Sequence, residues 1–324
     1  MNPNYKNIIG KDILEAAHYL EQGETVAIPT ETVYGLAANA LNEAAVHKIF
    51  AAKERPLYNP LIVHIKGIDA IDTYAKEIPD LAYRLLEAFA PGPLTLILPK
   101  QDIVPDLVTA GLAHVALRIP NHPLTLDLLA QLAFPLAAPS ANPFGYISPT
   151  TAAHVAKQLK GKIPYILDGG PCQKGLESTI IGFTEGVPVL HRVGALDLET
   201  IRKFVPDIKI LDKAEHKPVG PGMLAHHYSP HTKLELTPNL DDSLSAYLGQ
   251  KIGLISLSKK IRQIESKHQI QLSLNNDLEE AASQLYAAMH YLDSLGLDII
   301  LVERMPEIGL GISINDRLER AAAK

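Results

Sequence analysis

Cationic side chains stand beside or inside several apolar segments of this sequence. Lys53 and Arg55 precede one such segment, Arg118 interrupts the apolar run 115–119, and Arg192 ends another. A guanidinium in an apolar strand is costly unless it meets an anion. For Arg118 the sequence leaves open a structural ion pair or a carboxylate or phosphate ligand. Arg55, taken alone, is more typical of a solvated surface charge.

The densest group of polar side chains lies in the segment 28–36, Ile-Pro-Thr-Glu-Thr-Val-Tyr-Gly-Leu. We expect a strand that ends at Pro29 and then a tight polar turn, because Pro29 fixes a backbone dihedral and Gly35 allows close approach. Hydroxyls and a carboxylate at a strand end are typical of small-molecule sites in α/β folds. An ordinary connection with solvated hydroxyls fits this segment equally well.

The absence of several common motifs limits the kinds of site and reaction that the sequence can support. The sequence has no Gly-x-x-x-x-Gly-Lys-Ser/Thr loop and no Gly-x-Gly-x-x-Gly, so side chains and turns would have to hold any phosphate. No Ser-His-Asp or Cys-His set is convincing, because we expect the turn with Cys172 to be exposed and Ser140 lacks a nucleophile-elbow context. The side chains suit an enzyme that positions reactants while cations neutralise charge on a phosphate.

The composition indicates a globular protein with one large or two smaller domains, because 47% of its 324 residues are hydrophobic and 20% are charged. We expect a soluble, cytoplasmic protein without a membrane span, since no apolar run is long enough and no signal core is visible. The single cysteine excludes an internal disulfide. A net charge of -6 argues against a surface devoted to nucleic acid.

Periodicity predicts alternating helices and strands in the first two thirds of the chain. Helices are expected over 11–22, from the N-cap Asn42, over 121–133 and after 148–151, and strands over 94–98, 115–119, 134–138, 163–167, from 178 and over 189–194. We predict a twisted, mixed, open α/β sheet in a domain of residues 1–207.

The last third of the sequence has a different residue pattern from the first two thirds. Pro and Gly punctuate a linker over 208–232, and strands over 252–256 and 297–302 alternate with a helix from Leu278 and a charged C-terminal helix. We predict a small Rossmann-like parallel α/β domain of residues 233–324, which regulates or covers the first domain. A zinc site at His226, His227 and His231 is disfavoured, because no further ligands complete it.

Seven motifs together resemble the threonylcarbamoyl-adenylate synthase family, which has a YrdC-like fold. The resemblance covers roughly residues 10–200 and extends to the linker. The motifs are Pro-Thr-Glu-Thr-Val-Tyr-Gly-Leu from Pro29, Lys53-x-Arg55-Pro56, Pro60-Leu61 with His64, Pro91-Gly92-Pro93 with Thr95, Arg118-x-Pro120, Pro139-Ser140-Ala141-Asn142 and Glu177-Ser178-Thr179-Ile180.

The resemblance implies a nucleotidyltransferase that condenses L-threonine, bicarbonate and ATP to threonylcarbamoyl-AMP and pyrophosphate. This is the first step in making N6-threonylcarbamoyladenosine at position 37 of tRNA. It also implies Mg²⁺ with the ATP, although no carboxylate cluster indicates a metal site. The implied partners are the proteins that transfer the threonylcarbamoyl group to tRNA, and weak tRNA contact is compatible with it.

The resemblance also implies roles for individual residues. Lys53 and Arg55 would be catalytic. His114 departs from the family pattern, which usually has a hydroxyl residue there, so its side-chain contact to ATP is in doubt. The implied threonine-binding residues are Thr32, His64, Arg118, Ala138 and Ser178, and the implied ATP-binding residues are Lys53, Arg55, Asn59, His114, Ser140, Ser148, Arg192 and Tyr228.

Two other functions are alternatives to this synthase activity. An RNA-binding module of the same fold without catalysis would show salt-dependent tRNA affinity without ATP turnover. A carbamoyl-transfer accessory domain, as in hydrogenase-maturation proteins, is disfavoured because those chains carry cysteine-rich zinc segments and this one has a single cysteine.

Overall fold

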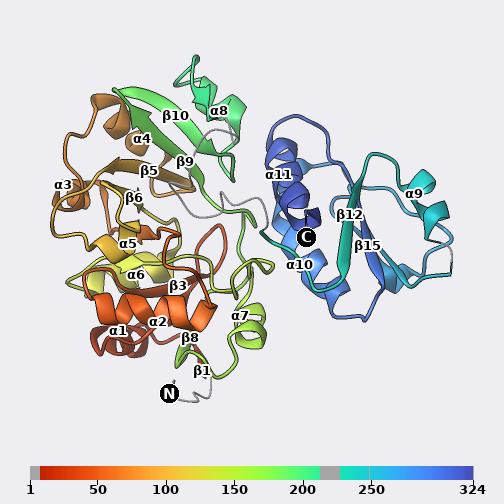
Figure 1. Cartoon of the computed structure of the whole chain (residues 1–324), viewed down its shortest axis with the longest axis horizontal. Coiled ribbons are helices and arrows are strands. Elements are labelled where there is room, and N and C mark those ends of the chain that lie inside the picture. Colours follow the sequence, from red (N-terminus) through yellow and green to blue (C-terminus); the bar gives the residue numbers. More distant parts are fainter. Residues whose placement is uncertain (1–7, 212–226, 248, 324) are drawn as a thin grey trace.

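The computed structural model describes residues 8–211, 227–247 and 249–323, whose strands form two sheets (Figure 1). The large sheet is mixed and belongs to residues 8–211, which we call the N-terminal region. Its strands lie in the order β1 (Ile8–Gly10), β8 (Tyr165–Leu167), β2 (Val26–Ile28), β3 (Gly35–Asn39), β7 (Leu136–Ala137), β4 (Ile62–His64), β6 (His114–Arg118), β5 (Leu94–Pro99), β9 (Thr179–Thr184), β10 (Val187–Arg192) and β11 (Lys209–Ile210).

The small sheet belongs to residues 227–323, which we call the C-terminal region, and all of its strand pairs are parallel. This confirms the predicted combination of a mixed sheet and a smaller parallel α/β unit. The predicted linker 208–232 falls mostly on residues 212–226, outside the described residues. The strands lie in the order β12 (Lys233–Thr237), β15 (Ile299–Glu303), β13 (Ile252–Ser256) and β14 (Gln269–Gln271).

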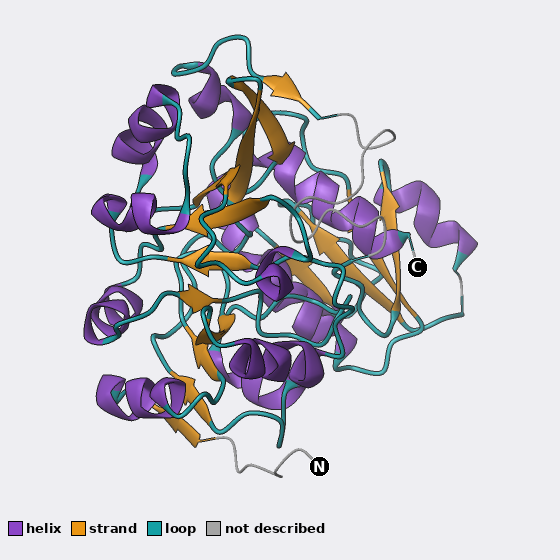
Figure 2. Ribbon diagram, turned by 60° about the vertical axis from the view of Figure 1, so that its left-hand side comes forward, coloured by secondary structure: helices purple, strands orange, loops and turns teal. Residues whose placement is uncertain are grey.

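The helices connect the strands and cover the sheets (Figure 2). In the N-terminal region they are α1 (Ile13–Glu21), α2 (Glu43–Lys53), α3 (Ile71–Tyr74), α4 (Asp80–Phe89), α5 (Asp106–Thr109), α6 (Pro123–Gln131), α7 (Ala152–Gln158) and α8 (Leu198–Arg202). In the C-terminal region they are α9 (Leu240–Ala246), α10 (Leu278–Asp293) and α11 (Leu310–Ala322).

Capping side chains fix where the predicted helices begin. Asn42 Oδ1 accepts hydrogen bonds from the backbone N–H groups of Ala44 and Ala45 and so starts α2 where the sequence predicts it. The same helix ends at Lys53, so its cap also fixes the position of this lysine. The sequence did not predict the strands β1, β3, β11, β12 and β14. Of these, β3 lies at the site, where the chain returns after the polar turn and runs antiparallel to β2.

The middle of the large sheet separates two kinds of packing. Side chains alternate between the faces of a strand. Val63 of β4, Leu96 of β5 and Leu117 of β6 belong to the main core with the helices. Their neighbours form a separate small cluster of Ile62, Ile97, Ala116 and Ile180 on the opposite face, which we call the site face. His64 and Arg118 alternate in step with this cluster and therefore lie on the site face as well.

The C-terminal region packs against the N-terminal region through α10 and α11 (Figure 1). Val33, Ile147 and Leu176 of the N-terminal region share one buried apolar cluster with Tyr286 of α10 and Ile314 of α11. A continuous core therefore joins the two regions. Among the described residues, no helix combines the length and apolar character that a bilayer crossing requires.

Replacing Asn42 by alanine should lower the free energy of unfolding by about 1 kcal/mol, because two N–H groups at the start of α2 lose their acceptor. Urea denaturation monitored by circular dichroism measures the change. Asn42→Asp is the matched control, since its carboxylate keeps the cap. Equal losses in both variants would contradict the capping role.

Candidate active site

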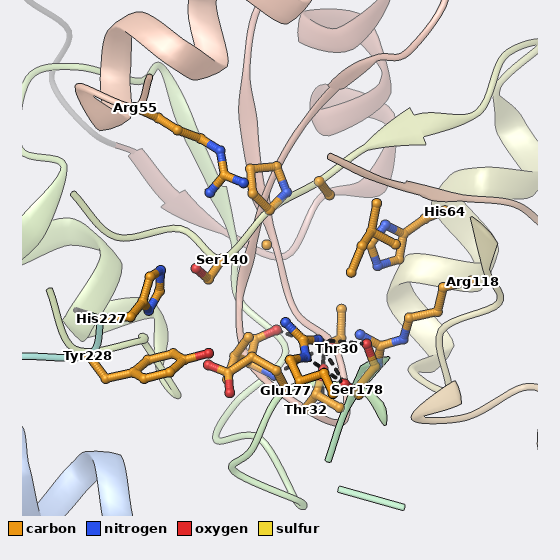
Figure 3. Close-up of a pocket in the computed structure, with 16 residues that line it drawn as sticks. Thr30, Thr32, Arg55, His64, Arg118, Ser140, Glu177, Ser178, His227 and Tyr228 are labelled. Atoms are coloured by element: carbon orange, nitrogen blue, oxygen red, sulfur yellow. Dashed lines mark hydrogen bonds between the residues drawn. The ribbon is translucent and has the colours of Figure 1, made fainter. Parts of the chain in front are cut away.

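A pocket lies over the site face and is closed on one side by Tyr228 (Figure 3). His64 and Arg118 stand on one side of it, and His227 and Tyr228 stand on the other. The cavity has a volume of about 40 Å³ in this conformation. The predicted site residues that line it are Thr32, Arg55, His64, Arg118, Ala138, Ser140, Ser178, Arg192 and Tyr228.

Arg118 makes an ion pair and also lines the pocket. Its Nη2 lies 2.7 Å from Glu31 Oε1, and its Nε donates to the carbonyl oxygen of Gly92 at 3.3 Å. The other oxygen of Glu31 accepts from the backbone N–H of Asn121 at 3.0 Å. The ion pair is therefore present, and it does not exclude the ligand alternative, because Arg118 also lines the pocket. Glu31 fixes the guanidinium at the pocket wall, where it is also placed to meet a carboxylate.

His64 pairs in register with Arg118 across β4 and β6. Burial, and then the charge of Arg118, lower the pKa of His64 to about 3, so the imidazole is neutral near pH 7. Its Nδ1 atom is buried and has no hydrogen-bond partner among the described residues. A neutral imidazole with a spare nitrogen can exchange a hydrogen bond with a polar ligand in the pocket.

Ser178 is held by two neighbouring strands. Its hydroxyl lies 2.7 Å from the Thr95 hydroxyl of β5. Arg192, the last residue of β10, donates from Nη2 to the Ser178 carbonyl at 2.7 Å and to the Ser178 hydroxyl at 3.1 Å. Arg192 thus fixes Ser178 at the pocket wall.

Lys53 and Arg55 form a cationic pair beside Ser140. Lys53 Nζ donates to the carbonyl oxygens of Ser140 and Asn142, and Arg55 Nη2 donates to Pro60 O at 2.9 Å. In residues 8–211, 227–247 and 249–323, no carboxylate pairs with either cation. Burial, and then Arg55, lower the pKa of Lys53 well below its usual value; burial and Arg192 lower that of Arg55 to about 9. A bound anion would relieve this unfavourable charge.

The remaining predicted nucleotide residues lie at different distances from the pocket. Asn59 is buried behind Arg55, and neither polar atom of its side chain has a partner in the described structure. Ser148 is buried and donates from Oγ to Glu177 Oε1 at 2.7 Å, so it meets the pocket through Glu177. His114 is the first residue of β6 and is exposed, four residues and so roughly 13 Å from Arg118 along the strand.

Seven lining residues lay outside our predicted set, and three of them have polar side chains, namely Thr30, Glu177 and His227. Thr30 belongs to the polar turn that the sequence indicated as a small-molecule site, although it was not among the predicted site residues. Glu177 stands inside a quoted motif, but no role was predicted for it. His227 was considered with His226 and His231 as a disfavoured zinc set, of which His226 lies outside the described residues. Burial lowers its pKa to about 3, with the cations of Arg55, Lys53 and Arg192 acting in the same direction and Glu177 opposing them.

Cys172 is buried, so the expectation of an exposed turn was wrong. Burial raises the pKa of its thiol to about 12, and a thiol of that acidity is a poor nucleophile. This agrees with the absence of a convincing covalent set in the sequence. Among the described residues, no three His, Cys, Asp or Glu side chains are grouped to hold a metal ion.

Comparison with known proteins covers both regions. Residues 18–194 match the family model described as "Telomere recombination", and residues 196–323 match the one described as "Threonylcarbamoyl-AMP synthase, C-terminal domain". The threonylcarbamoyl-AMP synthase of Pyrococcus abyssi is 42% identical, over 95% of this chain and 93% of the relative. That of Bacillus subtilis is 40% identical, over 96% and 92%.

A solved structure resembles the whole fold. The crystal structure of P. abyssi Sua5 complexed with L-threonine has a TM-score of 0.89 and 41% identity, and the match covers 98% of this chain and 96% of that one.

The buried neutral histidines predict a loss of stability in acid. The pKa values of His64, His227 and His290 are each lowered to about 3, mainly by burial. The unfolded chain, with pKa values near 6.5, therefore binds more protons below that pH. Each histidine should lower the free energy of unfolding by up to about 1.4 kcal/mol per pH unit between pH 6.5 and pH 3.

Urea denaturation between pH 7.5 and 5.0 measures this slope. His290→Gln should make it shallower, whereas His47→Gln on an exposed position should not. Parallel slopes for wild type and His290→Gln would contradict the assignment.

Proposed function

The chain belongs to the threonylcarbamoyl-AMP synthase family, and we propose that it joins L-threonine, bicarbonate and ATP to threonylcarbamoyl-AMP and pyrophosphate. This is the first step in forming N6-threonylcarbamoyladenosine in tRNA. The observation that carries the proposal is one pocket with two different halves. Arg118 and His64 form the threonine half, and Arg55, Ser140 and Arg192 with the adjacent Lys53 form the nucleotide half.

The threonine half fits the two charged ends of an amino acid. Arg118, fixed by Glu31, is placed for the carboxylate. His64, Thr32 and Ser178 offer neutral hydrogen-bonding groups for the hydroxyl and the amine. A relative of the same fold has been crystallised with L-threonine.

The nucleotide half fits a polyanion. Lys53 and Arg55 are buried cations that only backbone carbonyl oxygens hold in the described structure, and phosphate oxygens would supply the missing negative charge. The Asn59 amide, whose polar atoms have no partner there, lies behind Arg55.

The reaction follows from these positions. The threonine amine attacks bicarbonate carbon and water leaves, which gives a carbamate. A carbamate oxygen then bonds to the α-phosphorus of ATP, the bond from that phosphorus to the bridging oxygen breaks, and pyrophosphate leaves. Lys53 and Arg55 stabilise the charge that grows on the phosphate oxygens. The transfer of a nucleotidyl group makes the protein a nucleotidyltransferase.

Magnesium would bind to the protein as a complex with the substrate ATP. The described residues form no cluster for a metal ion, so Mg²⁺ would be bound by the triphosphate and water rather than by a protein cage. The product is consumed by proteins that transfer its threonylcarbamoyl group to tRNA. We place the protein in the cytoplasm for that reason, and weak contact with tRNA is compatible with the proposal.

Arg118→Ala should raise the KM for L-threonine by about 100-fold and leave the KM for ATP within about threefold, because it removes the charged partner of the carboxylate. Threonine-dependent pyrophosphate release, with L-serine and no amino acid as comparisons, measures both constants. Arg84→Ala, on an exposed position of α4, is the matched control.

No pyrophosphate release from folded wild-type protein with Mg²⁺ would reject the proposed reaction. Salt-dependent tRNA binding in such a protein would then favour the RNA-binding module.

Removing Mg²⁺ with EDTA should abolish pyrophosphate release and leave the thermal unfolding temperature unchanged, because the described residues hold no metal site. Excess Mg²⁺ should restore the activity. A drop in unfolding temperature with EDTA would reveal a structural metal and contradict the assignment.

A further inference from the structure

Glu177 lies at the pocket and takes part in a network between the two regions. It directly precedes Ser178, and its side chain lines the pocket (Figure 3). From the N-terminal region, Ser148 donates to Oε1 at 2.7 Å. From the C-terminal region, Arg317 of α11 donates from Nε to Oε2 at 2.8 Å, and the Tyr286 hydroxyl of α10 lies 3.1 Å from both carboxylate oxygens.

Arg317 is completely buried in this interface. Its Nη1 lies 2.8 Å from Asp316 Oδ2, and its guanidinium lies over the ring of Tyr228 at 5.5 Å from the centroid. Tyr228 itself lines the pocket. Arg317 therefore touches two pocket-lining residues from behind and does not line the pocket itself.

The Glu177 carboxylate depends on this cation. Burial alone would raise the pKa of Glu177, but Arg317, and after it Arg192, outweigh burial and hold the pKa below its usual value. A buried carboxylate that loses its partner is strongly unfavourable. Without Arg317, Arg192 would be the remaining cation that lowers the pKa of Glu177, and a poorly compensated negative charge would stand at the pocket that receives a triphosphate.

The second effect of Arg317 is on geometry. Each oxygen of Glu177 has a fixed partner, so the carboxylate is oriented with Oε1 towards Ser148. Ser148 is a predicted nucleotide contact. Its backbone carbonyl is held from the C-terminal region as well, by His290 of α10 at 3.1 Å. The docking of α10 and α11 thus determines where Ser148 lies.

We propose that Arg317 is a positioning residue for the nucleotide half of the site, through which the docked C-terminal region neutralises Glu177 and orients Ser148. The inference rests on the proposed function, since it assigns the nucleotide to this half of the pocket. The C-terminal region should therefore affect the binding of the two substrates differently. Nucleotide binding depends on Arg317, whereas threonine binding around Arg118 and Glu31 does not.

The test compares Arg317→Met with wild type. Isothermal titration calorimetry gives the Kd of L-threonine and that of the ATP analogue with a methylene group between the α- and β-phosphates. We expect the Kd of the analogue to rise by at least about tenfold and the Kd of threonine to stay within about twofold. Arg304→Met, which removes an exposed arginine paired with Glu307 and Glu319, should change neither constant.

A second substitution tests the route through Glu177. In Arg317→Met/Glu177→Gln the poorly compensated charge is gone and an oxygen remains to accept from Ser148. The Kd of the analogue should return to within about threefold of wild type. An ion pair that serves only to hold the interface together would predict no recovery. Circular dichroism and thermal unfolding establish that each variant is folded.

The inference is overturned by an unchanged analogue Kd in Arg317→Met, by equal losses for both ligands, or by failure of the double variant to recover. If Arg317→Met does not fold, Tyr286→Phe decides, because it removes one donor to Glu177 and leaves every charge in place. A twofold to fivefold rise in the analogue Kd supports the inference, and no rise overturns it. Wild-type protein that binds the analogue but shows no threonine-dependent pyrophosphate release would reject the proposed reaction alone.

Discussion

Several cations are buried around one pocket, and the rest of the structure has to stabilise their charge. Lys53, Arg55, Arg118 and Arg192 are all nearly inaccessible to water. Each donates to a backbone carbonyl oxygen next to a turn, at Ser140 and Asn142, Pro60, Gly92 and Ser178 respectively. A carbonyl compensates a buried charge only in part. Arg118 has the Glu31 carboxylate as a further partner, but Lys53 and Arg55 have no carboxylate partner among the described residues, so a bound anion would stabilise this pair.

The division of the large sheet into two faces makes this burial tolerable. One face of β4, β5 and β6 supplies Val63, Leu96 and Leu117 to the main apolar core. The other face carries only the small site-face cluster and the polar groups of the pocket. The polar groups thus occupy a surface that the main core does not need, and the C-terminal region shields it from water.

The sequence predicted local features well and long-range pairings poorly. The cap at Asn42 and the strand Ile252–Ser256 were found because local residue types determine them. The return strand β3 pairs with the neighbouring β2 as well as with the distant β7, and it was missed because its sequence, Gly-Leu-Ala-Ala-Asn, lacks β-branched and aromatic residues. The burial of Cys172 was missed because it depends on packing against distant segments. Residue types alone singled out Arg55, Arg118 and Arg192, and the family resemblance supplied the assignment of site residues to the two substrates. The sequence could not decide between an ion pair and a ligand role for Arg118, which makes an ion pair with Glu31.

The burial of Arg317 could not be predicted from the sequence. A charged C-terminal helix is typical of a solvated surface, yet α11 buries Arg317 and Asp316 at the contact with the N-terminal region. Nothing in the local sequence names Glu177 as their neighbour, 140 residues away.

The apolar cluster shared by the two regions has a consequence for how such a chain can change in length during evolution. Val33, Ile147 and Leu176 are covered by α10 and α11. A chain that ended after the large sheet would expose them to water, together with the Glu177 carboxylate. Loss of the C-terminal region would therefore have to be accompanied by polar replacements at these positions, or the shortened protein would aggregate through them.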